Sequence, residues 1–356
     1  MHPSDALMTL QQTIEHYAHD FLVRYGHRLR DEHRHALSAM RRCRTEHYGH
    51  THWQCAGCQH TQDSLRSCGH RSCQRCQNHD NSQWLERQQA KLLAVDYFMV
   101  TFTLPAECRQ VAWKNQREMY ALLLQSAVST CRDFARNDKH LRGEIGLSAV
   151  LHTHTRRLDY HPHVHLVIPG GAIDTKAHCW RCPKGKFLFA HRPLAKVFRA
   201  RMLTAMKQAA LLPQRSLPEN WVVDCRAIGN GLPALKYLSR YLYRGVISEK
   251  QLVCDDGVSV TFRYRDGQTQ QWKTRTVDGA HFLWLLVQHV LPSGFRRVRD
   301  YGFLHGNAKR RLICVQWFLK VSLSAPPSRP RPAFLCPHCA EPMQVTGVTL
   351  PRRLSG

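Results

Sequence analysis

The feature that most constrains the fold is a block of cysteines and histidines between residues 43 and 76. It contains the pairs Cys55-x-x-Cys58 and Cys73-x-x-Cys76. A Cys-x-x-Cys pair turns two thiolates toward one ion, and two such pairs complete a closed, tetrahedral zinc site. We therefore predict that Cys55, Cys58, Cys73 and Cys76 bind one structural Zn²⁺.

Further side chains of the same block could form a second zinc site, with free buried cysteines as the alternative interpretation. The candidate ligands are Cys43, Cys68, His70 and His50, and His47, His52 and His60 compete for the histidine roles. Outside the block, Cys179 and Cys182 have zinc spacing without a partner pair nearby, which indicates coincidence. Cys336 and Cys339 form a better half-site, whose remaining ligands the sequence does not identify.

The cellular compartment decides between metal and disulfides for the 15 cysteines. The N-terminal stretch MHPSDALMTLQQ lacks the apolar core of a signal peptide, and no run of eighteen apolar residues is present. We therefore expect a cytoplasmic protein without a membrane partner. In that reducing compartment, clustered cysteines indicate metal binding.

The charge balance points to a polyanionic partner. The chain carries 51 Lys and Arg against 26 Asp and Glu, a formal net charge of +25. A surface this basic is typical of nucleic-acid binding, and a basic ribosomal or membrane-surface protein is the alternative. At 356 residues the chain can form two or three compact units.

Hydrophobic spacing predicts mixed helices and strands. Helical periodicity runs through residues 5–42, and another long helix is expected over 107–138. Two strand-like runs, 146–153 and 159–168, are close enough to pair antiparallel, and residues 258–277 resemble a hairpin that turns at Asp266-Gly267. The fold class is therefore α+β, an antiparallel sheet with helices packed on it, preceded by the small Cys/His module.

The predicted strand at 159–168 carries histidines at alternate positions, in the sequence YHPHVHLVIPGG. Because side chains alternate between the two faces of a strand, His163 and His165 share one face. Two fixed neutral imidazoles can hold a divalent ion and leave positions open for substrate. His152 and His154 on the neighbouring strand are candidates for a third ligand, and the role of His161 stays open.

A tyrosine pair follows in the helical stretch LPALKYLSRYLYRG. Tyr237 and Tyr241 are four residues apart, so they lie on one helical face. The cationic residues Lys236, Arg240 and Arg244 flank them and could contact phosphate. A tyrosine that attacks phosphate must lose a proton with a pKa near 10, which a metal and nearby cations make easier.

A His-x-His strand followed by a Tyr-x-x-x-Tyr helix resembles the HUH superfamily of single-strand endonucleases. The motif order within residues 40–345 resembles the two-tyrosine rolling-circle transposases of the insertion sequence 91 family. This order comprises the cysteine block, VTFTLP, EIGLSAVLHT, YHPHVHLVIPGG, KYLSRYLYRGVIS and HVLPSGFRRVRDYGFL.

The resemblance implies an HUH-type sheet that binds Mg²⁺ or Mn²⁺ at His163 and His165, with Tyr237 and Tyr241 as nucleophiles. The expected activity is nicking of single-stranded DNA at the ends of an insertion element and strand joining through 5′-phosphotyrosine links. The expected partners are those element ends and the target DNA, and the oligomeric state stays unknown. We expect five segments: a helical segment at 1–42, a DNA-binding zinc domain at 43–94, the endonuclease domain at 95–250, its C-terminal part at 251–325, and a linker with a Cys-x-x-Cys tail at 326–356.

Two positions depart from the family pattern. Where the family usually has Trp-Gly-Gln after Leu-His-Thr, this chain has His154-Thr155-Arg156, so His154 or His152 could replace the glutamine near the metal. Where the family usually has Arg-His-Tyr-Gly, this chain has Asp300 in the second position.

Three other functions compete with this one. A replication initiator would use the same chemistry, but the chain shows no helicase motif. A non-catalytic zinc-dependent DNA-binding regulator derived from a transposase would need neither the histidine pair nor both tyrosines. A metal-dependent hydrolase or oxygenase would leave the tyrosine helix unexplained.

Overall fold

The computed structural model describes residues 9–76, 78–185, 187–243, 246–321 and 333–351. Within the helices it does not describe the side chains of residues 78–82, 237 and 240–243. The chain divides into two compact units. Unit 1 comprises Met1–Ser82, Tyr243–Val290 and Pro327–Gly356, and unit 2 comprises Gln83–Leu242 and Leu291–Pro326.

Unit 2 is built on a five-stranded antiparallel sheet with the strand order β12-β4-β5-β3-β8. The sheet strands are β3 (Tyr97–Thr103), β4 (Leu147–His154), β5 (Tyr160–Pro169), β8 (Val223–Ala227) and β12 (Val298–Tyr301). A small hairpin is formed by β6 (Ala172–Asp174) and β7 (Cys179–Arg181). The helices that lie wholly or mainly in this unit are α3 (Asn78–Gln89), α4 (Arg109–Lys114), α5 (Gln116–Asn137), α6 (His191–Gln208), α7 (Leu232–Tyr243) and α9 (Lys309–Phe318).

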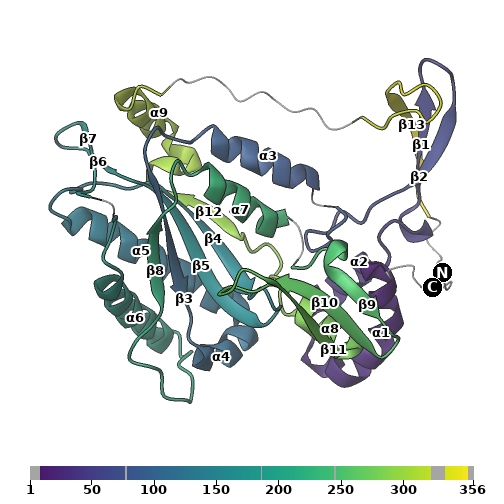
Figure 1. The fold of residues 1–356 in the computed structure, drawn as a ribbon, viewed down its shortest axis with the longest axis horizontal. Helices are drawn as coiled ribbons and strands as arrows, with labels where there is room; N and C mark the ends of the chain where they lie inside the picture. The colour runs from purple at the N-terminus through teal and green to yellow at the C-terminus, as the bar shows by residue number, and fades with distance from the viewer. Residues whose placement is uncertain (1–8, 77, 186, 244–245, 322–332, 352–356) are drawn as a thin grey trace. The chain divides into compact units, whose positions relative to one another are not determined.

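One face of this sheet forms the main hydrophobic core, against α5 and α6 (Figure 1). Alternate strand positions such as Phe102 and Val164 point into it, where they join Leu123 of α5 and Phe198 of α6. Phe102 and Phe198 are in contact, with ring centroids 4.7 Å apart. Because side chains alternate between the two faces of a strand, the residues that alternate with these core positions face the other side of the sheet.

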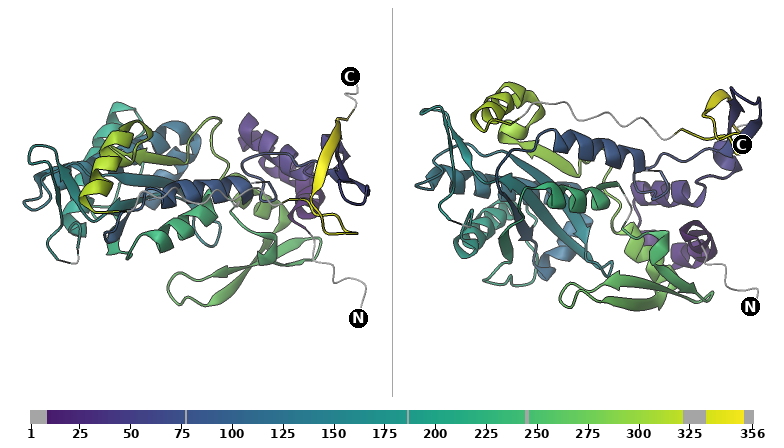
Figure 2. Two further views of the ribbon diagram at one scale, coloured as in Figure 1. Left: turned by 90° about the horizontal axis from the view of Figure 1, so that it is seen from above. Right: turned by 45° about the horizontal axis from the view of Figure 1, so that its top comes forward.

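The other face carries both apolar and polar side chains, and we call it the histidine face, after His152, His163 and His165. Its β12 edge is covered by α3, whose Gln88 donates a hydrogen bond to Asp300 at 3.1 Å. Figure 1 and Figure 2 both show α7 beside α3, on the side of the sheet away from α5 and α6. The sheet therefore separates the main hydrophobic core from the histidine face, which has its own helices.

Unit 1 contains helices and two three-stranded antiparallel sheets, with the orders β13-β1-β2 and β11-β10-β9. Its helices are α1 (Leu10–Tyr25), α2 (Asp31–Arg41) and α8 (Gly279–Val287). Its strands are β1 (His50–Cys55), β2 (Thr61–Leu65), β9 (Leu252–Asp255), β10 (Ser259–Arg265), β11 (Trp272–Asp278) and β13 (Met343–Thr349). Short 3₁₀ turns in the two units span Gly26–Arg28, Glu46–Tyr48, Ala106–Cys108, Glu249–Gln251, Gly302–Leu304 and Gly306–Ala308.

Packing of α1 against α8 requires a glycine. A Cβ at Gly279 would lie 2.2 Å from ring atoms of Tyr17, so no larger side chain fits without displacing that ring. The Tyr17 hydroxyl donates a hydrogen bond to Asp255 at 2.6 Å, which links α1 to β9. At the C-terminal end of α1, the rings of Tyr25 and Trp284 stack with their centroids 5.0 Å apart.

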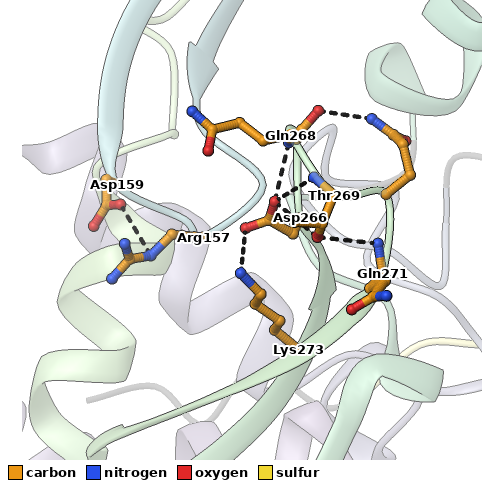
Figure 3. Close-up of polar contacts among 9 residues, drawn as sticks. Arg157, Asp159, Asp266, Gln268, Thr269, Gln271 and Lys273 are labelled. Carbon is orange, nitrogen blue, oxygen red and sulfur yellow. Dashed lines mark hydrogen bonds and ion pairs between the residues drawn. The ribbon is translucent and has the colours of Figure 1, made fainter.

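The predicted hairpin is present, and Asp266 closes its turn (Figure 3). Its carboxylate accepts hydrogen bonds from the backbone N–H groups of Gln268 at 3.0 Å and Thr269 at 2.9 Å. Lys273 Nζ lies 3.1 Å from the same carboxylate. These bonds hold the pKa of Asp266 below its usual range, with the Thr269 N–H as the largest cause.

The structure confirms the predicted α+β class and the antiparallel pairing of the two histidine-bearing strands. Two predicted helical stretches are divided, however. The N-terminal stretch forms α1 and α2, and the stretch over 107–138 breaks at Asn115, between α4 and α5. The five-segment domain organisation stays a prediction.

Candidate metal centre

Three histidines of the histidine face come together at the junction of β4 and β5. His152 is paired with His163 across these strands, and His165 is two residues farther along β5. One ring nitrogen from each lies within 4.8 Å of the others. The ring centroids of His152 and His165 are 4.5 Å apart. This spacing fits ligands that surround one ion.

Hydrogen bonds orient two of these rings. Nδ1 of His163 lies 2.7 Å from the backbone oxygen of His161, which only accepts, so Nδ1 carries the proton and Nε2 carries the lone pair. Nδ1 of His165 lies 2.9 Å from Oγ1 of Thr101 on β3. Partners of this kind hold a ligating imidazole in one orientation.

Burial keeps these imidazoles neutral. It lowers the pKa of His163 to about 4 and lowers the pKa values of His152 and His165 well below their usual range. In His152 and His165, neighbouring histidines add to the effect of burial. Neutral imidazole is the form that binds a metal, so the three side chains fit a divalent ion at neutral pH.

The other two candidate histidines lie outside this group. A bulge between His152 and His154 shifts the register, so that His154 is paired with Tyr160 and not with His161. His161 accepts a hydrogen bond on Nδ1 from Arg109 at 2.9 Å. Burial and the Arg109 charge lower the pKa of His161. Of the two candidate third ligands, the structure thus brings His152, and not His154, to the His163–His165 pair.

The tyrosine helix α7 lies on the same side of the sheet as these histidines (Figure 1). Leu235 and Leu238 are buried, whereas Lys236 is exposed. The backbone of Tyr237 and Tyr241 belongs to α7, but their side chains, and that of Arg240, lie outside the described residues. Arg244 lies wholly outside them.

The cysteines form two four-sulfur groups. The first contains Cys43, Cys68, Cys73 and Cys76, whose sulfurs all lie within 4.8 Å of one another. Cys76 Sγ is 3.5 Å from the sulfurs of both Cys43 and Cys68. Hydrogen bonds from Cys68, and next from Cys73, hold the pKa of Cys76 below its usual range, which favours a thiolate.

The second group contains Cys55, Cys58, Cys336 and Cys339. The predicted quartet, in which Cys55 and Cys58 share an ion with Cys73 and Cys76, is therefore wrong in its grouping. The physical reason is strand pairing: β13 pairs along β1 and brings the tail cysteines to Cys55. Cys73 and Cys76 instead meet Cys43, which follows α2.

The histidines proposed for the second zinc site lie outside both sulfur groups. Nε2 of His50 lies at hydrogen-bond distance, 2.7 Å, from the Glu46 carboxylate, and Nδ1 of His70 accepts a hydrogen bond from the backbone of Ser72 at 3.1 Å. Among the described residues, Cys179 and Cys182 also belong to neither group. Thr101 and Arg109, which contact the site histidines, were not identified from the sequence. The only available signal for Thr101 was strand alternation in VTFTLP, because partners on other strands depend on register.

Two family models match the chain. One described as "Transposase zinc-binding domain" matches residues 10–104, and one described as "Putative transposase" matches residues 146–311. The putative transposase y4qJ of Sinorhizobium fredii is 33% identical, over 94% of this chain and 96% of that protein. The chain belongs to the transposases of the insertion sequence 91 family.

A further relative of the transposase is the transposase for insertion sequence element IS801 of Pseudomonas savastanoi pv. phaseolicola. It is 28% identical over 82% of this chain and 74% of that protein. Among solved structures, a conjugative relaxase TrwC in complex with mutant oriT DNA matches 63% of this chain and 74% of that chain. The TM-score of this match is 0.28, and the sequence identity is 12%.

Within the described residues, no helix combines the length and the apolar character that crossing a membrane requires.

Proposed function

We propose that the transposase nicks single-stranded DNA at the ends of its insertion element and joins strands through 5′-phosphotyrosine intermediates, as in rolling-circle transposition. The observation that carries this proposal is the group of three neutral imidazoles, His152, His163 and His165, on one sheet face. The helix that bears Tyr237 and Tyr241 lies on the same side of that sheet. Neither feature is needed by a protein that only binds DNA.

His152, His163 and His165 would hold the catalytic ion, Mg²⁺ or Mn²⁺. When bound, this ion would supply Lewis-acid polarisation of the phosphate that is cut. The protein's own contribution is to hold the three imidazoles neutral by burial and to orient His165 through Thr101. The group Cys43, Cys68, Cys73 and Cys76 would hold a structural Zn²⁺ in the zinc-binding domain.

Tyr237 and Tyr241 would act as nucleophiles. The phenol oxygen forms a bond to phosphorus while the bond from phosphorus to the 3′-oxygen breaks, and the phenol proton is lost as the released 3′-oxygen gains one. The products are a 5′-phosphotyrosine and a 3′-hydroxyl. Because the new ester retains the free energy of the old one, the 3′-hydroxyl of another strand can attack it without a nucleotide. Lys236, Arg240 and Arg244 would neutralise phosphate charge near the helix.

Covalent-adduct formation tests the proposal directly. Single-stranded oligonucleotides with an element end are labelled at the 5′ or the 3′ terminus, incubated with the protein and Mn²⁺, and resolved on denaturing gels. We expect a protein-linked band that retains the 3′ label. It should decrease in the single variants Tyr237→Phe and Tyr241→Phe and disappear in the double variant, whereas Tyr243→Phe on the same helix serves as the matched control.

The metal assignment has its own matched pair of variants. His152→Ala removes a member of the triad, whereas His154→Ala removes a histidine two residues away that lies outside it. We expect His152→Ala to reduce Mn²⁺ affinity by more than the roughly 10–100-fold cost of losing an outer-shell partner, and His154→Ala to change it little. If the wild-type protein formed no covalent adduct with DNA, that result would favour the alternative function, a non-catalytic DNA-binding regulator.

A further inference from the structure

The second sulfur group unites residues from distant parts of the chain. Cys55 Sγ is 3.4 Å from Cys339 Sγ, across 284 residues of sequence. Cys58 Sγ is 3.6 Å from Cys336 Sγ and 3.5 Å from Cys339 Sγ. A disulfide needs about 2.05 Å, whereas the edge of a zinc–thiolate tetrahedron with bonds of about 2.3 Å is about 3.8 Å. The observed distances fit the tetrahedron.

The two loops that carry these cysteines have the same backbone hydrogen bonds. In the first, the N–H of Cys55 donates to the oxygen of His60 at 2.9 Å, and the N–H of Gln59 donates to the oxygen of Cys55 at 3.1 Å. In the second, Cys336 donates to Glu341 at 2.8 Å, and Ala340 donates to Cys336 at 2.9 Å.

The residue after the second cysteine of each loop also has the same conformation. Gln59 has φ of 59° and Ala340 has φ of 60°, in the left-handed region that residues other than glycine seldom adopt. The left-handed conformation costs free energy, so its presence at both equivalent positions indicates that the two loops meet the same structural requirement. Turning two thiolates of one loop toward a single ion is such a requirement.

The tail also contacts the module through a strand and two aromatic pairs. β13 pairs antiparallel with β1 from Cys55–Met343 to His50–Thr349. The rings of Trp53 and Phe334 have centroids 4.8 Å apart, and those of His60 and His338 are 4.1 Å apart. These contacts surround the sulfur group, so the two loops meet as halves of one small domain.

We propose that Cys55, Cys58, Cys336 and Cys339 bind a second structural Zn²⁺, which ties the tail to the β1–β2 hairpin. Four thiolates in tetrahedral spacing favour zinc, which fills a closed structural site. Cys336 and Cys339 lie beyond residues 10–104, the range matched by the zinc-binding family model. The zinc module is therefore discontinuous in sequence, and a fragment ending at residue 104 lacks half of the ligands of this site.

Alkylation of the zinc-loaded, full-length protein tests this proposal without a mutation. Cys58 and Cys339 are exposed, as are Cys182 and Cys314, which belong to neither sulfur group among the described residues. Treatment with N-ethylmaleimide, followed by peptide mass spectrometry, gives the alkylation rate of each. We expect Cys58 and Cys339 to react slower than Cys182 and Cys314 by roughly a factor of ten or more, until a chelator is added. Reaction of Cys339 at the rate of Cys182 in the zinc-loaded protein would overturn the proposal.

Two variants test the grouping. In Cys55→Ser, Cys339 should lose its protection from alkylation while Cys73 keeps it. In Cys68→Ser, Cys73 should lose that protection while Cys339 keeps it. If Cys55→Ser made Cys73 reactive and left Cys339 protected, the result would support the quartet predicted from the sequence. It would refute the proposed group of Cys55, Cys58, Cys336 and Cys339.

If Cys55→Ser makes the cysteines of both sulfur groups reactive, the zinc content per chain distinguishes the two groupings. The double variant Cys336→Ser/Cys339→Ser should retain one Zn²⁺ fewer per chain than the wild type. The matched control Cys179→Ser/Cys182→Ser, with the same spacing, should retain the wild-type number. An unchanged zinc content in the tail variant, or iron released in place of zinc, would contradict the proposal.

Discussion

Thr101 illustrates how a residue outside the histidine triad can orient a side chain of the proposed metal site. Its hydroxyl lies 2.9 Å from Nδ1 of His165, on the strand next to it. Such a partner selects one imidazole orientation and leaves the other nitrogen for the ion.

We predict that Thr101→Val lowers Mn²⁺ affinity by about 10–100-fold, because the substitution keeps the shape of the side chain and removes the hydroxyl. Calorimetric titration with Mn²⁺ measures the affinity. Thr103→Val, two residues along the same face and opposite His163, is the matched control. Equal losses in the two variants would show that the hydroxyl of Thr101 has no special role.

His33 provides a pH-dependent contribution to stability. It is fully buried near the start of α2, where its Nδ1 accepts a hydrogen bond from the backbone N–H of Arg30 at 3.1 Å. Burial, with a smaller effect of Arg30, lowers the pKa of His33 from 6.5 to about 4. Between these two pH values the unfolded chain binds a proton at His33 that the folded chain does not, so the free energy of unfolding falls as the pH falls.

We predict that His33→Gln removes this dependence. Glutamine can accept the same backbone hydrogen bond at this helix position. The free energy of unfolding of the wild type, relative to the variant, should decrease by at most about 3 kcal/mol from neutral pH to pH 4, and should stay constant above pH 6.5. Urea unfolding at a series of pH values measures the difference, and His19→Gln on the exposed side of α1 is the control. A difference that is independent of pH would refute the assignment.

At the scale of elements, Asp300 connects three segments at the β12 edge of the sheet. Its carboxylate lies 2.5 Å from Lys91 Nζ, after α3, and accepts hydrogen bonds from Ser148 of β4 at 2.6 Å and Gln88 of α3 at 3.1 Å. The sequence showed only that aspartate replaces the family's usual histidine here. In the structure the acidic side chain at this position forms an ion pair with Lys91.

We predict that Asp300→Ala lowers the free energy of unfolding by about 2–3 kcal/mol, because it removes charged hydrogen bonds in a partly buried site. The control is Asp224→Ala, which breaks an exposed ion pair with Arg226 on the same sheet and should cost about 0–1 kcal/mol. Thermal or urea unfolding followed by circular dichroism compares the two. Equal costs would mean that Asp300 does not hold the elements together.

The elements also show where prediction from sequence succeeds. The antiparallel neighbours β4 and β5 follow from their alternating apolar positions and from the short connection between them. The bulge between His152 and His154 does not, because an extra residue in a strand reflects how the whole sheet pairs. The sequence therefore predicted two candidates for the third imidazole, and the register brought one of them to the site.

At the scale of the whole molecule, the net charge of +25 should govern the proposed encounter with DNA. Binding should weaken steeply with salt, since each phosphate contact releases counterions and adds roughly −0.7 to the log–log slope for single strands. Fluorescence anisotropy of a labelled oligonucleotide over a KCl series measures this slope.

A matched pair of lysine variants tests whether one lysine contributes to the salt dependence of DNA binding. Lys236 is exposed on α7, and Lys207 is exposed on α6, on the opposite side of the sheet. We predict that Lys236→Gln makes the slope shallower by about 0.7, whereas Lys207→Gln leaves it unchanged. Identical slopes for both variants and the wild type would exclude a phosphate contact at Lys236.

The sequence by itself determined what local backbone geometry controls. Strand alternation placed His163 and His165 on one face, helical spacing placed Tyr237 and Tyr241 on one helix, and Cys-x-x-Cys spacing identified the pairs of thiolates. Only the tertiary structure decided which pairs of cysteines come together and which histidine joins His163 and His165. Cys55 meets Cys339 across 284 residues because β13 pairs with β1, and His152 meets His163 because of sheet register. Such pairings depend on the packing of distant segments, which no local spacing encodes.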